Sequence, residues 1–147
     1  LLDLGERDGS TFVRESSRAT RRARDFAESV NAAIEPISPT TVFPSTTLGS
    51  QMRTIARVIG ARRTLGQTRQ VFFVGFGGWD THDNMLEDHQ TLLSSISQAL
   101  GAFYAATVEL GVADAVTTFT MTDFGRTLNN NGDGTDHGWG AHQLVLG

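Results

Sequence analysis

A short apolar run at residues 70–76 constrains the fold of this chain more than any other sequence feature. The run reads Gln-Val-Phe-Phe-Val-Gly-Phe, so it is rich in β-forming residues and lacks the alternation of a strand with one wet face. Runs of this kind are typical of strands that are buried on both faces of a parallel sheet. We therefore expect residues 70–76 to form a central strand.

A long helix and a second strand are predicted after this run. Apolar residues recur at steps of three and four from Leu86 to Leu110, and Gly111 provides a helix stop. Residues 115–121 then have the composition of a second strand. A strand, a helix and a strand of these lengths suit the crossover between two parallel strands. The fold class predicted from these elements is α/β, with a mostly parallel sheet.

Two amphipathic helices and a proline-rich connector are expected before this unit. Apolar residues at a period near 3.6 predict a helix over residues 11–34, and the connector that follows holds all three prolines of the chain. A second helix is expected to run to Leu65, where Gly66 provides a stop. We expect a single partial domain over residues 1–147, with the helix and connector in 1–46 and an α/β core piece in 47–147.

A last apolar stretch, residues 144–146, has the composition of the beginning of another strand. A parallel sheet of only two or three strands would leave its edges unpaired. We therefore expect a truncated domain, whose natural partners include the flanking segments of a longer parent chain.

Charge divides the chain into two halves of opposite sign. Residues 1–69 carry eleven Arg against seven acids, and residues 70–147 carry only Arg126 against nine acids. The arginines of the first half spread around a helix without interleaved aromatic residues, so we expect no nucleic-acid partner. We also expect no membrane span, because no stretch is long and apolar enough. The acidic half favours a bound cation.

The loop after the first predicted strand holds the first polar cluster. Residues 77–83 read Gly-Gly-Trp-Asp-Thr-His-Asp, so Asp80 and His82 lie two positions apart and can both point into one cleft. Carboxylate oxygens and imidazole nitrogens bind divalent ions, and two glycines allow a close approach of the backbone. The alternative is a polar turn that caps the next helix, with Asp80 or Asp83 at the N-cap.

The second polar cluster, residues 122–127, follows the second predicted strand. Its candidate cleft carboxylate is Asp123. Arg126 is the only basic residue of the C-terminal half, and two roles are open to it. It either pairs with Asp123 or Asp136, or it clamps an anionic substrate in bidentate fashion.

The third polar cluster, residues 129–142, is rich in Asn and Gly and contains Asp136 and His137. An adjacent carboxylate and imidazole between glycines suit a metal ligand and the partner that orients it. The alternative is an ordinary loop histidine. His89, by contrast, lies on the apolar seam of the long helix, and we expect it to be a packed residue outside the site.

These three loops hold three of the four histidines and five of the nine acids of the C-terminal half. In a parallel sheet they would gather at one edge, where ligands usually bind. Because the chain has no cysteine, a metal site must use His and carboxylate ligands. The cofactor we expect is a divalent ion, such as zinc, manganese, magnesium or calcium. The constellation favours metal-assisted hydrolysis.

Three motifs carry a resemblance to a known family: Gly-Gly-Trp-Asp-Thr-His (77–82), Thr-Asp-Phe-Gly-Arg-Thr (122–127) and Gly-Thr-Asp-His-Gly-Trp-Gly (134–140). In this order and spacing they resemble a bacterial family known as domain of unknown function 1501. The resemblance is specific from about residue 43 to residue 147. It implies an internal piece of a longer protein that is often exported by the twin-arginine route, and hence a periplasmic or exported location.

The family resembles the alkaline-phosphatase-like superfamily, which implies a partial α/β/α sandwich with a two-metal site for phosphate and sulfate groups. Carried over to this chain, the resemblance implies these metal ligands: Asp80, His82, Asp123, Asp136 and His137. The chain departs from the superfamily pattern at Phe124, which stands where a His commonly follows the Asp. The resemblance also places the nucleophile in a region that this chain does not contain.

Two functions fit these expectations. The first is a metal-dependent hydrolase of the phosphatase or sulfatase type that acts on a small anionic substrate, with Arg126 as the candidate anion clamp. The alternative is a non-catalytic, exported binding or assembly module that keeps the fold with a degenerate metal site. The substitution at Phe124 motivates this second interpretation.

Overall fold

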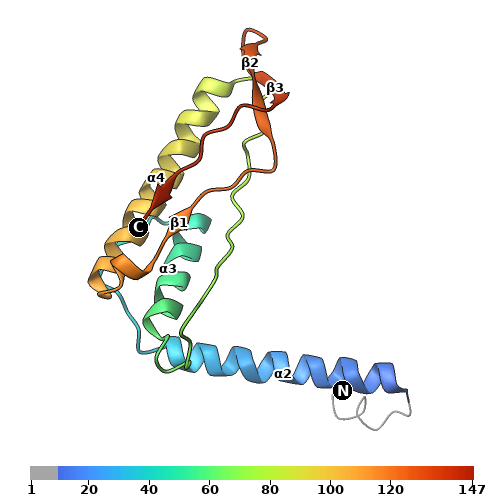
Figure 1. The fold of residues 1–147 in the computed structure, drawn as a ribbon, viewed down its shortest axis with the longest axis vertical. Coiled ribbons are helices and arrows are strands. Elements are labelled where there is room, and N and C mark those ends of the chain that lie inside the picture. The colour runs from blue at the N-terminus through green and yellow to red at the C-terminus, as the bar shows by residue number, and fades with distance from the viewer. Residues whose placement is uncertain (1–9) are drawn as a thin grey trace. The chain divides into compact units, whose positions relative to one another are not determined.

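The computed structural model describes residues 10–147, which form two compact units. The first unit comprises the described residues up to Ser38 together with Arg57–Arg69. The second unit comprises Pro39–Ala56 and Gln70–Gly147, and it holds all the residues of the three polar clusters (Figure 1). No helix among residues 10–147 combines the length and the apolar character needed to cross a membrane.

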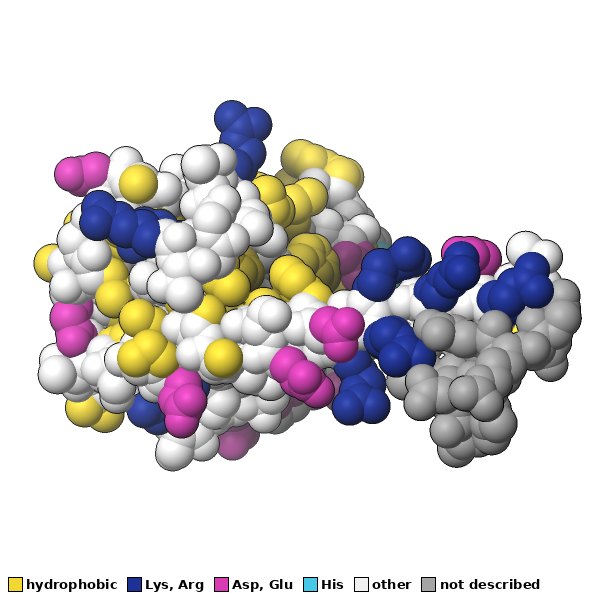
Figure 2. Space-filling view, turned by 90° about the horizontal axis from the view of Figure 1, so that it is seen from below, with side chains coloured by type: hydrophobic (Ala, Val, Ile, Leu, Met, Phe, Trp, Pro, Cys, Tyr) yellow, Lys and Arg dark blue, Asp and Glu magenta, His cyan; other side chains and the backbone are white. Residues whose placement is uncertain are grey.

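The first unit is built around helix α2 (Thr11–Ile34), whose bounds match the expected helix. The C-terminal end of α2 is packed, because Ala33 and Ile34 are buried together with Ala61. The guanidinium group of Arg57 donates hydrogen bonds to the backbone carbonyls of Ile34 and Ile37, at 2.8 and 2.9 Å. These bonds satisfy carbonyl groups that the end of a helix leaves free. Farther along α2, Figure 2 shows arginine side chains gathered on its surface.

Helices α3 and α4 also lie where apolar periodicity predicts them. Helix α3 (Thr47–Gly60) begins in the second unit and ends before the expected Leu65. Helix α4 (Met85–Glu109) closely matches its expected bounds, and Gly111 follows it with a φ of +66°. Glycine adopts this left-handed conformation without the steric cost of a Cβ, so it provides the stop. A short 3-10 helix, η1 (Ala113–Ala115), comes next.

Strands in the described residues form two small antiparallel sheets. Strand β1 (Thr118–Phe119) pairs with β4 (Val145–Leu146), and strand β2 (Gly125–Asn130) pairs with β3 (Thr135–Gly138). The register of the second pair sets Arg126 opposite His137. Figure 1 shows this second pair as a hairpin that follows β1 along the chain.

The prediction of a mostly parallel sheet in an α/β/α sandwich is therefore wrong. Residues 70–76 join no strand, and of residues 115–121 only Thr118–Phe119 pairs, with a segment that returns in the opposite direction. The apolar pattern shows which side chains favour burial, but it does not specify the neighbouring strand. The strands of the described chain pair in antiparallel fashion instead, and antiparallel pairing needs no crossover.

The C-terminal end of α4 is tied to the connector before α3. The carboxylate of Glu109 accepts four hydrogen bonds, from the backbone N–H and the hydroxyl groups of Thr40 and Thr41, at 2.6 to 3.0 Å. The backbone N–H of Thr40, followed by the groups of Thr41, lowers the pKa of Glu109 from its ordinary 4.5 to about 2. This clamp fixes the start of the second unit to its longest helix.

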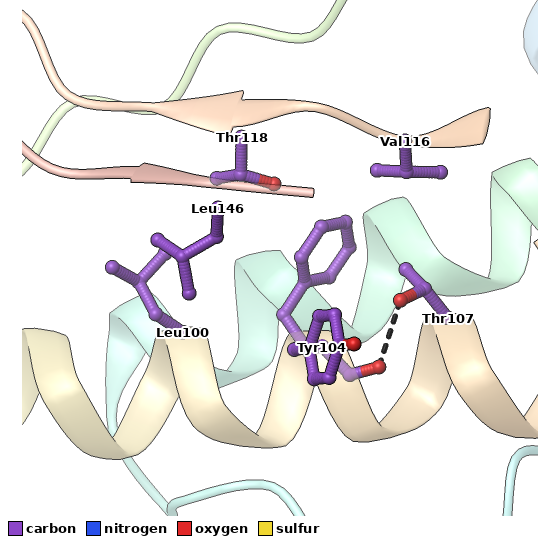
Figure 3. A pocket seen from close by; sticks show the side chains of 7 residues that line it. Leu100, Tyr104, Thr107, Val116, Thr118 and Leu146 are labelled. Atoms are coloured by element: carbon purple, nitrogen blue, oxygen red, sulfur yellow. Dashed lines mark hydrogen bonds between the residues drawn. The ribbon is translucent and has the colours of Figure 1, made fainter. Parts of the chain in front are cut away.

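A small hollow lies between α4 and the β1–β4 pair. Figure 3 shows Leu100 and Tyr104 of α4 on one side and Val116, Thr118 and Leu146 on the other. The hydroxyl of Thr107, also at this hollow, donates a hydrogen bond to the backbone carbonyl of Tyr104 at 2.7 Å. The volume of the hollow, about 10 Å³, corresponds to roughly one water molecule. The hollow therefore belongs to the packing of the second unit.

Candidate metal centre

Three side chains from two separate segments converge at the hairpin. Asp80 and His82 come from the segment before α4, and His137 comes from β3. One possible ligand atom from each lies within 4.8 Å of the other two. The Nε2 atoms of His82 and His137 lie 2.9 and 2.7 Å from the same oxygen of Asp80, Oδ1. All three residues are exposed, so this group of donors is open to solvent.

Asp136 lies behind this group rather than within it. Its Oδ1 is 3.0 Å from Nδ1 of His82, on the side of the ring away from Asp80. A carboxylate at one imidazole nitrogen holds the proton there and leaves the other nitrogen free to bind a metal ion. Asp136, which we expected to be a ligand, is therefore placed to orient His82.

The alternating directions of an extended backbone explain why Asp80 and His82 face the same way. Thr81, between them, is only 3% exposed, and its Oγ1 lies 3.1 Å from Nε2 of His89 on α4. Successive side chains of extended backbone point to opposite sides, so burying Thr81 turns both neighbours outward. His89 also lies edge-on to the ring of Trp79, with centroids 5.7 Å apart. It is thus a packed residue, and it supports the segment that carries the candidate ligands.

Hydrogen bonds attach this segment to the hairpin along its length. The side-chain amide of Asn131 donates to the backbone carbonyl of His82 at 2.9 Å. Two backbone hydrogen bonds also join the segment to the hairpin. The N–H of Thr135 donates to the carbonyl of Thr81 at 3.4 Å, and the N–H of Met85 donates to the carbonyl of Asp133 at 3.1 Å. The hairpin therefore fixes the position of residues 79–85 through these hydrogen bonds.

Gly134 is required for this close approach. A Cβ at this position would lie 2.3 Å from the backbone carbon and oxygen of His82. Real Cβ contacts are never this short, so any other residue would force the two segments apart. The Asn-Gly-rich sequence of the third cluster thus has a structural purpose, because the side chain of Asn131 also accepts hydrogen bonds from the N–H groups of Asp133 and Gly134.

The electrostatic environment keeps Asp80 ionised. The hydrogen bond from His137 is the main cause that lowers the pKa of Asp80 below its ordinary 3.8. Burial opposes this shift, while the charges of His137, His82 and Arg126 reinforce it. An ionised carboxylate beside two imidazoles is a suitable donor set for a divalent ion such as zinc.

Aromatic stacking holds the ring of His137. The ring of Phe124 stacks on it with centroids 4.2 Å apart and an interplanar angle of 16°, and the ring of His82 stacks at 5.2 Å. The guanidinium carbon of Arg126 lies 5.3 Å from the centroid of Phe124. The residues that sequence reasoning missed are Phe124, which supports the ring, and Asn131, which supports the backbone. The only available signal was their place inside the polar clusters.

The structure thus brings together some of the residues predicted from the sequence and not others. Asp80, His82 and His137 form the ligand group, and Asp136 orients one of them. Asp123 is exposed and does not belong to the group found among residues 10–147. Arg126 pairs with Asp80 at 3.0 Å, rather than with Asp123 or Asp136 as we expected for a paired arginine.

Comparison with known proteins identifies the family. A family model described as "Protein of unknown function (DUF1501)" matches residues 7–147, so the chain belongs to this family. No curated protein and no solved structure matched the chain.

Proposed function

We propose that this member of the DUF1501 family binds one divalent metal ion through Asp80, His82 and His137, and that the ion serves the hydrolysis of a small phosphate or sulfate ester. One observation carries the proposal. The Nε2 atoms of His82 and His137 lie 2.9 and 2.7 Å from Oδ1 of Asp80, and all three residues are exposed to solvent. Catalytic zinc sites typically have three protein ligands and an open position, whereas structural sites are closed by four.

The residues present fit such an ion. The donor atoms are the nitrogen and oxygen types that zinc and similar ions prefer, and the lowered pKa of Asp80 further favours its ionised form. When bound there, a divalent ion supplies a Lewis acid that lowers the pKa of water and offsets charge on a phosphoryl or sulfuryl oxygen. The chain's own contribution is to hold His82 through Asp136 and His137 through Phe124.

The choice of substrate class rests on the resemblance of the three motifs to the DUF1501 family, which in turn resembles the alkaline-phosphatase-like superfamily. We extend only the chemistry of that superfamily to this chain, namely the hydrolysis or transfer of phosphate and sulfate groups. The convergence of Asp80, His82 and His137 supports this extension, because these residues come from two of the three motifs. Asp123, from the remaining motif, stays outside the group, which favours one ion rather than two.

A second candidate function is a binding or assembly module that holds the ion without catalysis. Arg126 favours it, because this only basic residue of the C-terminal half is already bonded to Asp80 and to two backbone carbonyls. An anionic substrate would then find no free cationic side chain from residues 70–147 at the site.

Metal analysis of the purified chain after zinc reconstitution and dialysis tests the proposal. We expect about one equivalent of zinc in the wild type and in His142→Ala, and a loss of most of it in His82→Ala and in His137→Ala. His142 is a matched control, because it is an exposed histidine outside the ligand group. Equal zinc content in all four proteins, or none in the wild type, would overturn the metal site.

Assays with p-nitrophenyl phosphate and p-nitrophenyl sulfate, on a protein that also carries the nucleophile region implied by the family resemblance, then separate the two functions. Hydrolysis that depends on zinc and is lost in His137→Ala supports the hydrolase. Stoichiometric zinc binding without hydrolysis of either ester supports the binding module.

A further inference from the structure

Arg126 is unusual among the residues of the site because its side chain is largely buried. It is only 16% exposed, whereas the side chain of Asp80, its ion-pair partner, is 55% exposed. Arg126 is also the only basic residue in the acidic half of the chain. A buried arginine in contact with one exposed carboxylate requires an explanation, because long charged side chains are rarely withdrawn from water unless they are paired.

The contacts of the guanidinium group show what it connects. One terminal nitrogen donates to the backbone carbonyl of Thr135 on β3. The other donates to the backbone carbonyl of Trp79 at 2.7 Å and to Oδ1 of Asp80 at 3.0 Å. One planar group therefore joins the hairpin to the backbone just before the ligand segment and to the ligand itself.

This arrangement restricts Asp80 in a way that the other contacts do not. The bond to Trp79 fixes the backbone next to Asp80, and the bond to Oδ1 fixes the side chain. Both bonds come from the same nitrogen of a rigid, planar group, so backbone and carboxylate are held in one relative position. The oxygen that is held is the one that both imidazoles approach.

We infer that Arg126 is a positioning residue that presets Asp80 for metal binding, rather than a clamp for the anionic substrate. The inference rests on the proposed metal site. Partners that orient metal ligands typically change metal affinity by roughly 10- to 100-fold when they are removed. It follows that negative charge on the substrate is met by the bound ion and not by Arg126.

A purely electrostatic role would have the opposite sign. A positive charge 3.0 Å from the ligand oxygen repels a cation, so its removal would tighten metal binding if charge alone mattered. A positioning role predicts weaker binding instead. The direction of the change in affinity therefore distinguishes the two roles.

The test compares Arg126→Ala, Arg126→Lys and the control Arg53→Ala in the full chain. Zinc affinity is measured by competition with a chromophoric chelator, and the geometry at the ion is followed by the visible spectrum of bound cobalt(II). We expect zinc affinity to fall roughly 10- to 100-fold in Arg126→Ala. Arg126→Lys retains the charge but not the planar fork, so we expect it to bind nearly as weakly as Arg126→Ala. Arg53, which is exposed on α3, should have no effect.

We also expect the cobalt(II) spectrum to change in both Arg126 variants, which general destabilisation of the fold would not cause. Unchanged or tighter zinc binding in Arg126→Lys and Arg126→Ala, with wild-type spectra, would overturn the inference and leave the metal site intact. If Arg126→Ala does not fold, Arg126→Lys decides the question alone. A wild type that binds no zinc would instead overturn the proposed function.

Discussion

Residues 70–76 and the β2–β3 hairpin differ in whether their backbone pairs with another strand. The hairpin pairs its own two strands, and its Asn131 and Arg126 also donate to the carbonyls of the segment that precedes α4. Residues 70–76 belong to no strand in the described chain, and Val71 and Phe73 are 90% and 91% exposed. Polar side chains thus hold the second region to the segment before α4, while an apolar composition does not by itself make the first region a strand. The difference teaches that hydrogen bonds between the hairpin and the segment before α4, rather than hydrophobicity, build the candidate metal centre.

The largest expected effect is a difference in stability between the substitutions of two phenylalanines. Phe103 on α4 is 5% exposed and Phe73 is 91% exposed. We expect Phe103→Ala to lower the free energy of unfolding by about 3–5 kcal/mol, because it leaves a cavity in the core. Phe73→Ala should change it by less than about 0.5 kcal/mol, as for other surface positions. Urea unfolding followed by circular dichroism measures both. Equal losses would show that residues 70–76 are packed as tightly as α4 and would remove the contrast.

A smaller effect is expected at the contact between the hairpin and the ligand segment. Gly134→Ala places a Cβ against the backbone of His82, and we expect a loss of about 1–3 kcal/mol together with weaker zinc binding. The matched control is Gly77→Ala, because a Cβ at Gly77 would meet no atom within 4 Å. Thermal unfolding with and without zinc tests the pair. If Gly134→Ala bound zinc as tightly as Gly77→Ala, the hairpin would not fix the position of the ligand segment.

The smallest expected effect is a pH dependence of stability. It comes from Glu109 at the end of α4, not from the hairpin. The pKa of Glu109 is lowered in the folded chain from 4.5 to about 2, so its ionised form stabilises the fold. This contribution is fully present above pH 4.5 and is lost as the pH falls toward about 2. We expect Glu109→Gln to be less stable than the wild type at neutral pH and the difference to shrink across this window.

Melting temperatures of the wild type, Glu109→Gln and the control Glu87→Gln, measured as a function of pH, test this expectation. Glu87 is exposed in the first turn of α4 and lies outside the clamp. A gap between the wild type and Glu109→Gln that stays constant down to the lowest pH would contradict the assigned role of the carboxylate.

The helices could be predicted from the sequence because their signal is local. The apolar period of α2 and α4, the proline-rich connector after α2 and the glycine stop after α4 are all features of the nearby sequence. The sheets could not be predicted, because strand pairing depends on partners elsewhere in the chain. Residues 70–76 have the strongest strand composition, yet the two longest strands, Gly125–Asn130 and Thr135–Gly138, form in a polar stretch for which the sequence predicts loops.

The candidate site was predictable in part for the same reason. Asp80 and His82 face one way because they are two residues apart in an extended segment, and this relation is visible in the sequence. That His137 joins them and Asp123 does not depends on the hairpin register, which places Arg126 opposite His137. The roles of Phe124 and Asn131 depend on contacts across the fold, so spacing alone could not reveal them.

The most direct test of the account is a zinc titration of the chain followed by ¹⁵N-detected NMR of the histidine rings. We predict that Nε2 of His82 and Nε2 of His137 shift together and saturate at about one equivalent, while the rings of His89 and His142 do not respond. A titration in which only one of the two rings responds, or in which His142 responds equally, would contradict the claim that the hairpin brings Asp80, His82 and His137 into one metal site.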